Sequence, residues 1–176
     1  GQNVRLEKNE KTTMKMIPPV FETALHGGQG SDNACTPPMG WGDRGLRIAA
    51  PTKIITQGTY HLPVCGSYMF SGRFLLQFKN VDAEMTIVIV DTKTHQSFST
   101  SVFGASDGDP LPPIASYGIV FTDEQLEHPS GGGFNIDLYA DEYIPSLPKR
   151  PAKYIIYALL GDQKSNVVEV EIVDTE

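Results

Sequence analysis

The amino-acid sequence predicts an all-β fold: an antiparallel β-sandwich, immunoglobulin-like but elaborated, with long loops and at most one short helix. Near the C-terminus, Val168, Val170 and Ile172 alternate with Glu169 and Glu171, a period of two that indicates a strand with one buried face. The 17 glycines and 13 prolines among 176 residues indicate many turns. Short apolar segments recur between these turn residues at a spacing typical of a sandwich.

The length of the chain suits one domain. We expect residues 1–11, which are polar, to form a flexible lead-in, and residues 12–176 to form a single β-sandwich domain. Two short strands are expected at residues 12–17 and 20–25, before a long glycine-rich loop over residues 26–45.

Strands return at residues 46–50 and 53–56. In residues 59–70, Pro63 and Gly66 favour a bent or edge strand, because proline cannot donate to a ladder and glycine weakens one. Residues 73–79 carry Phe74, Leu76 and Phe78 at alternate positions and are expected to form the next strand.

Two antiparallel neighbours are expected after it. Residues 85–90 are apolar on both faces, which suits a central, covered strand. Residues 96–103 alternate between an apolar face and a serine face formed by Ser97, Ser99 and Ser101. That serine face favours an edge strand, to which a partner strand could add.

A second long loop is expected over residues 104–118. Residues 122–128 form the one predicted helix, because Thr122 can cap it, Gln125 can reach back to the cap, and Pro129 ends it. In residues 134–139 we expect the apolar side chains to point inward and Asn135 and Asp137 to point to solvent.

The chain ends in a predicted hairpin. Residues 154–160 and 167–173 are apolar runs joined by a polar connection. The segments YIIYALLG (154–161) and SNVV (165–168) resemble the last two strands of immunoglobulin-like or fibronectin-type sandwich domains. The resemblance covers this part only. It implies a sandwich, and no function follows from it.

The charge balance excludes two classes of partner. The net charge is −7 and the 14 Lys and Arg residues form no stripe, which argues against binding to nucleic acid or to an anionic membrane surface. The sequence also contains no apolar run near the roughly 20 residues that a spanning helix requires.

The two cysteines, Cys35 and Cys65, allow two interpretations. They are either buried free thiols of a cytosolic protein or a disulfide formed in an oxidising compartment. We favour the disulfide because Cys35 lies in a polar, glycine-rich segment, and such a bond would stabilise the fold by roughly 3 kcal/mol. Together with Gly1 in place of an initiator Met, this predicts a secreted or periplasmic protein whose signal peptide has been removed.

Catalytic and metal signatures are weak. The 4 histidines lie in separate segments, and neither a G-x-S-x-G elbow nor a zinc spacing is present, so we expect no enzyme and no catalytic residues. Calcium is the one cofactor considered, at Asp107 and Asp109 in the second long loop. The alternative is that these aspartates are solvated turn residues.

Binding through loops is the leading functional hypothesis. Apolar residues on proline-stiffened loops lose little entropy on docking. The candidate binding residues are Met39, Trp41, Arg44, Leu111, Ile114 and Tyr117. The alternative is that they cover the sheet ends, with Trp41 buried as an anchor.

The sequence therefore predicts a non-catalytic exported module that recognises a protein partner through its long loops or an exposed edge strand. An inhibitor or immunity protein is one concrete form of this function. The alternative is a carbohydrate-binding or calcium-assisted adhesion domain.

Overall fold

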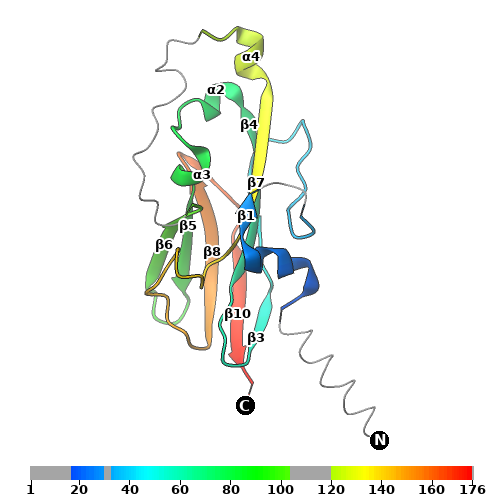
Figure 1. Cartoon of the computed structure of the whole chain (residues 1–176). Helices are drawn as coiled ribbons and strands as arrows, with labels where there is room; N and C mark the ends of the chain where they lie inside the picture. The colour runs from blue at the N-terminus through cyan, green and yellow to red at the C-terminus, as the bar shows by residue number, and fades with distance from the viewer. Residues whose placement is uncertain (1–16, 30–32, 104–119, 176) are drawn as a thin grey trace, which may run out of the picture.

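In the computed structural model, residues 17–29, 33–103 and 120–175 are described. The chain folds into two β-sheets with an apolar core between them (Figure 1), which confirms the all-β sandwich. The predicted lead-in over residues 1–11 and the whole of the second long loop lie outside the described residues. The division into residues 1–11 and 12–176 therefore stays a prediction.

The first sheet has four strands in the order β1-β7-β4-β2, all paired antiparallel. Their bounds are β1 (Gly28–Gln29), β2 (Gly45–Ala49), β4 (Pro63–Ser71) and β7 (Pro129–Asp137). The long pair at its centre is β4 and β7, which run side by side from Pro63 opposite Asp137 to Ser71 opposite Pro129.

The second sheet has the order β3-β10-β8-β5-β6, with β9 paired to β8. Its strands are β3 (Lys53–Thr56), β5 (Thr86–Asp91), β6 (Ser97–Ser101), β8 (Ala152–Leu160), β9 (Gln163–Lys164) and β10 (Val168–Asp174). Strands β8 and β10 pair antiparallel, as the predicted terminal hairpin requires. Strand β5 pairs with β6 as expected, but its other neighbour is β8 and not the segment 73–79. The pairing of β3 with β10 is parallel.

Alternate side chains of the two sheets meet in the core. The first sheet contributes Val64, Phe70, Phe134 and Ile136, and the second contributes Ile87, Ile89, Tyr154, Ile156, Val170 and Ile172. Each is less than 5% exposed. Burial of one large apolar side chain stabilises a fold by roughly 1.5–3 kcal/mol, so this layer holds the two sheets together.

Strand β4 is central, so the prediction of an edge strand was wrong. It lies between β2 and β7. Pro63 is its first residue, where proline is tolerated. Gly66 is needed for packing, because a Cβ atom there would clash with the Phe134 ring.

The predicted strand over residues 73–79 was also wrong. Ser71 caps a short helix, α2 (Gly72–Leu75), and accepts a hydrogen bond from the backbone N–H of Phe74. The rings of Phe70, Phe74 and Phe78 pack in series, with centroids 4.4 and 5.3 Å apart. Phe70 belongs to β4, Phe74 to α2 and Phe78 to the segment after α2, so the three rings form a tilted cluster where the strand turns into the helix.

More short helices are present than the one expected. Besides α2, they are the 3₁₀ segment η1 (Pro19–His26), where a strand was predicted, α3 (Val81–Glu84) and α4 (Asp123–Glu127). Helix α4 has the predicted capping box between Thr122 and Gln125. Helices α2 and α4 lie together at the end of the molecule opposite the C-terminus (Figure 1). Across the described ranges, no helix has the length and apolar character needed to cross a membrane.

The outer face of the first sheet is partly covered. Segment η1 packs against β4 and β7 and contributes Ala24 to a small apolar cluster with the two cysteines. Asn135 and Asp137 were predicted to face solvent, which was wrong: they are buried at 4% and 6% exposure, and Asp137 is hydrogen-bonded to His61 and Leu62 of the chain before β4.

One side chain joins the two sheets at the edge strand β2. The Asn166 side chain accepts a hydrogen bond from the backbone N–H of Ile48 at 2.8 Å. It also donates one to the Ile48 carbonyl at 3.0 Å. Asn166 lies between β9 and β10, so this amide ties the first sheet to the second.

Candidate binding groove

A groove of about 500 Å³ lies against β4 and β7. One wall is the loop that precedes β2, and the floor is formed by the middle of β4 and the glycine-rich start of β7. Its lining residues are Thr36, Pro37, Pro38, Met39, Trp41, Ser67, Tyr68, Met69, Gly131 and Gly132.

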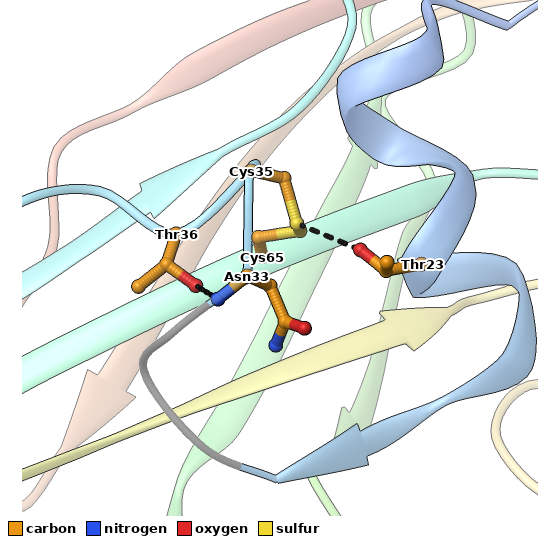
Figure 2. Close-up of a disulfide and its surroundings, with 5 residues drawn as sticks. All are labelled: Thr23, Asn33, Cys35, Thr36 and Cys65. Atoms are coloured by element: carbon orange, nitrogen blue, oxygen red, sulfur yellow. Dashed lines mark hydrogen bonds between the residues drawn. A yellow bond between two sulfur atoms is a disulfide. The ribbon is translucent and has the colours of Figure 1, made fainter.

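A disulfide anchors the wall of the groove. Cys35, at the start of the loop, is bonded to Cys65 of β4, with a Cα–Cα distance of 5.9 Å. The predicted disulfide is confirmed. Figure 2 shows the bond beside η1, whose Thr23 hydroxyl lies 3.7 Å from the Cys35 sulfur. Because Cys65 belongs to a central strand, the loop starts from a fixed point beside the groove floor.

Side chains of the neighbouring strands hold the next part of the loop by hydrogen bonds to the loop backbone. The Ser67 hydroxyl donates to the carbonyl of Pro37 at 2.6 Å. The Arg47 guanidinium donates to the carbonyl of Pro38 at 2.9 Å. At the base, the hydroxyl of Thr36 accepts from the backbone N–H of Asn33 (Figure 2).

The tip of the loop is a turn closed by polar side chains. The Asp43 carboxylate accepts from the backbone N–H of Gly40 at 2.7 Å. The Arg44 guanidinium donates to the carbonyls of Trp41 and Asp43 at 2.8 and 2.7 Å. Arg44 therefore holds the loop in shape through its backbone.

Trp41 is exposed at the rim of the groove. Its exposed fraction is 69%, so the alternative of a buried anchor was wrong. Its ring lies 6.2 Å from that of His128, which precedes β7. The structure thus brings Trp41 and Met39 into one groove, whereas Arg44 does not line it and instead bonds to the carbonyls of Trp41 and Asp43. The other candidates, Leu111, Ile114 and Tyr117, lie outside the described residues, as do the calcium candidates Asp107 and Asp109.

Sequence reasoning missed the glycines of the floor, because the strand predicted over residues 134–139 begins after them, whereas β7 begins at Pro129. A Cβ atom on Gly131 would lie 2.5 Å from the Tyr68 carbonyl oxygen, and one on Gly132 would lie 2.5 Å from the Tyr68 hydroxyl. The Tyr68 side chain therefore lies close against the strand. A glycine inside a strand often marks such an approach, and three in a row before an alternating segment were the available signal.

The groove carries no formal charge. Burial raises the pKa of Tyr68 to about 12, and the nearby Asp82 carboxylate adds to the effect, so the Tyr68 hydroxyl is neutral at physiological pH. The remaining lining residues have side chains that do not ionise.

A second hollow, of about 430 Å³, lies at the other end of β7 and is polar. There one oxygen of the Asp137 carboxylate lies 2.6 Å from Nδ1 of His61. The other oxygen accepts from the backbone N–H groups of Leu62 and Tyr139 at 2.8 and 3.1 Å. These bonds tie the chain before β4 to the end of β7.

The described part of the chain offers no metal centre: it contains no group of three or more His, Cys, Asp or Glu residues placed to hold an ion. The predicted calcium site at Asp107 and Asp109 lies outside the described residues and stays a prediction.

No protein-family model matches the sequence, and no curated protein matches it either. Many solved structures show a distant likeness, of which three are described. One is titled "BspA_C_mut", with 7% identity and a TM-score of 0.31, covering 76% of this chain and 53% of that one. Another is the AgI/II polypeptide BspA C-terminal domain of Streptococcus agalactiae, with 9% identity and a TM-score of 0.29, covering 74% and 50%.

The third is AggA, the major subunit of aggregative adherence fimbriae type I from Escherichia coli. It has 8% identity and a TM-score of 0.26, and the match covers 76% of this chain and 96% of AggA. The present chain spans about half the length of the two BspA structures. The likeness concerns the fold alone, and at these TM-scores nothing about function is drawn from it.

Proposed function

We propose that this protein is a non-catalytic, exported binding module that recognises a protein partner through the groove beside Trp41. The exposure of Trp41, at 69% on an anchored loop, is the observation that supports this most directly. Tryptophan buries a large apolar area when it is covered, and it is enriched among the residues that dominate binding energies at interfaces.

The anchoring of the loop supports the same proposal. The disulfide at Cys35 and the hydrogen bonds to Pro37 and Pro38 hold the backbone in place before any partner arrives. A loop that is already ordered loses less conformational entropy on docking, so more of the contact energy is left for affinity. An inhibitor or immunity protein that inserts this rim into an enzyme cleft is one form of the proposal, and Leu111, Ile114 and Tyr117 of the second loop are proposed to contribute.

Two further features support the parts of the proposal that concern export and the lack of catalysis. A disulfide such as Cys35–Cys65 forms and persists in oxidising compartments, which supports secretion or a periplasmic location. The groove offers no side chain that titrates near neutral pH, which supports binding without proton transfer.

Site-specific photo-crosslinking tests the proposal. A benzophenone amino acid is placed at Met39 or at Gly42, where an added Cβ meets no atom within 4 Å, and the protein is irradiated in its native compartment. The matched control is Val167, which is 51% exposed in the connection before β10. We expect a discrete protein adduct from positions 39 and 42 and none from 167. Equal labelling at all three positions, or none at 39 and 42, contradicts the proposal.

A further inference from the structure

Building on the proposed function, we infer that the groove receives an uncharged apolar side chain, of the leucine or methionine kind, presented by a peptide segment of the partner. The chemistry of the lining selects this class over a charged group and over a sugar.

Charged groups find no counter-charge in the groove. Ionised side chains around the loop are already bonded to its backbone: Arg47 of β2 to the Pro38 carbonyl, Arg44 to the Trp41 carbonyl, and Asp43 to the Gly40 N–H. The Asp82 carboxylate, which acts on Tyr68, is not among the lining residues. A ligand charge placed among the lining residues would lose its hydration without compensation, which is strongly unfavourable.

Sugars require hydrogen-bonding groups that can meet their hydroxyls, and only three of the lining residues, Thr36, Ser67 and Tyr68, carry a hydroxyl group. The Ser67 hydroxyl is bonded to the Pro37 carbonyl, and the residue is only 3% exposed. The Thr36 hydroxyl accepts from Asn33, and the Tyr68 hydroxyl lies against Gly132. A polar ligand that exchanges water for unpaired contacts gains little.

The apolar part of the lining is matched to an aliphatic guest. Met39 stands on the loop wall and Met69 on the floor, with the rings of Pro37, Pro38 and Trp41 around them. Thioether side chains are flexible and polarisable, so they adapt to differently shaped apolar groups. Gly131 adds depth, since a Cβ there would lie 2.9 Å from the methyl carbon of Met69. The volume of about 500 Å³ lies within the usual range for a ligand pocket.

A random-peptide library, selected in parallel on the full chain and on Trp41→Ala, tests the inference. Peptides that depend on Trp41 are expected to share one position occupied by Leu, Met or another aliphatic residue. Trp41 is the only tryptophan of the chain, so its fluorescence reports the binding of each synthesised peptide directly.

Two variants of the partly exposed Met69, similar in size to the wild-type residue, show whether peptide affinity depends on the apolar character of this side chain or on its shape. Met69→Leu keeps an apolar floor and is expected to bind the selected peptides within about twofold of wild type. Met69→Gln has a similar size but places an amide under the guest, and is expected to lose about tenfold in affinity. Thermal melting of both variants verifies that they fold alike.

Several outcomes overturn the inference. They are a charged or polar residue at the shared position, equal binding by the two Met69 variants, no Trp41-dependent peptide at all, or a fluorescence response to neutral oligosaccharides with the peptides silent. A charged consensus together with cross-links at positions 39 and 42 would leave protein recognition standing and remove only the ligand class. Oligosaccharide binding without cross-links would remove both.

Discussion

The two ends of β7 differ in the groups that surround the strand. At its start, Gly131 and Gly132 have no side chains, and the space beside them is bordered by apolar groups, among them the exposed Trp41. At its end, Asp137 is buried, and each of its oxygens lies within hydrogen-bonding distance of a donor group of the protein. The polar end is complete within the chain, whereas the apolar end leaves surface uncovered.

This difference separates stability from recognition. A buried carboxylate with internal partners contributes to folding and has little left to offer a ligand. Exposed aromatic and thioether groups contribute little to folding and gain from being covered. The comparison therefore assigns the stability of this region to Asp137 and its binding capacity to the groove.

The largest expected effect is at the polar end. Asp137→Ala removes the acceptor of the Leu62 and Tyr139 N–H groups, which are then left without a hydrogen-bond partner from Asp137. It also removes the partner of His61. We expect the free energy of unfolding to fall by roughly 3–5 kcal/mol, measured by urea denaturation. His61→Ala, which removes one contact to a half-exposed ring, should cost only about 1 kcal/mol. Equal losses in the two variants would contradict the assignment.

Removing the disulfide comes next. The double variant Cys35→Ser, Cys65→Ser frees a loop closed over 30 residues, and the expected loss is roughly 3 kcal/mol. It should also weaken binding at the groove, because the loop loses its fixed point. Mass spectrometry with alkylation, with and without reduction, checks the bond in native protein. Free alkylation of both thiols in denaturant alone would contradict the bond and the proposed export.

The glycine floor gives a smaller effect. In Gly131→Ala the new Cβ meets the Tyr68 carbonyl oxygen at 2.5 Å, and backbone of a central strand cannot move aside easily. A loss of about 1–3 kcal/mol in unfolding free energy is expected. Gly42→Ala is the control, since its Cβ meets nothing within 4 Å. If both substitutions are neutral in a melting experiment, the close packing of β4 against β7 is not needed.

The smallest effect on stability is expected at Trp41. Trp41→Ala removes an exposed ring and should change the unfolding free energy by no more than about 0.5 kcal/mol. Affinity for the partner should nevertheless fall by about 30-fold or more, as for a central interface tryptophan. Titration calorimetry with a cross-linked partner, once isolated, measures this. If Trp41→Ala loses stability and keeps its affinity for the partner, the assignment of binding to the groove is contradicted.

The second sheet was predictable from the sequence because its strands alternate. In β10, Val170 and Ile172 are buried while Glu169 is exposed, as the period of two indicates. In the first sheet the same reasoning failed. A glycine within a strand indicates a weak or edge strand when only its sequence neighbours are considered. Gly66 is instead required in a central strand because the Phe134 ring, distant in sequence, occupies the space of a Cβ atom. Asp137 alternates like a solvent-facing residue, although bonds to the preceding chain segment bury it.

The groove was predictable only in part. Sequence reasoning selected Met39 and Trp41 from their place on a proline- and glycine-rich loop and left open whether Trp41 was buried. Its exposure depends on where the Cys35–Cys65 bond and the Ser67 hydroxyl hold the loop, which is a property of contacts distant in sequence. The floor at Gly131 was missed because the three consecutive glycines before the alternating segment were not interpreted as part of the strand.

The Asn166 amide that holds both polar groups of Ile48 has a consequence for how the protein behaves at high concentration. An outermost strand with free backbone groups is a template on which another chain can lie, and runs of such additions lead to aggregates. Here a side chain of the same molecule occupies the backbone positions that an incoming strand would need at the middle of β2. We expect loss of that amide to make the protein self-associate as well as loosen the contact between its sheets.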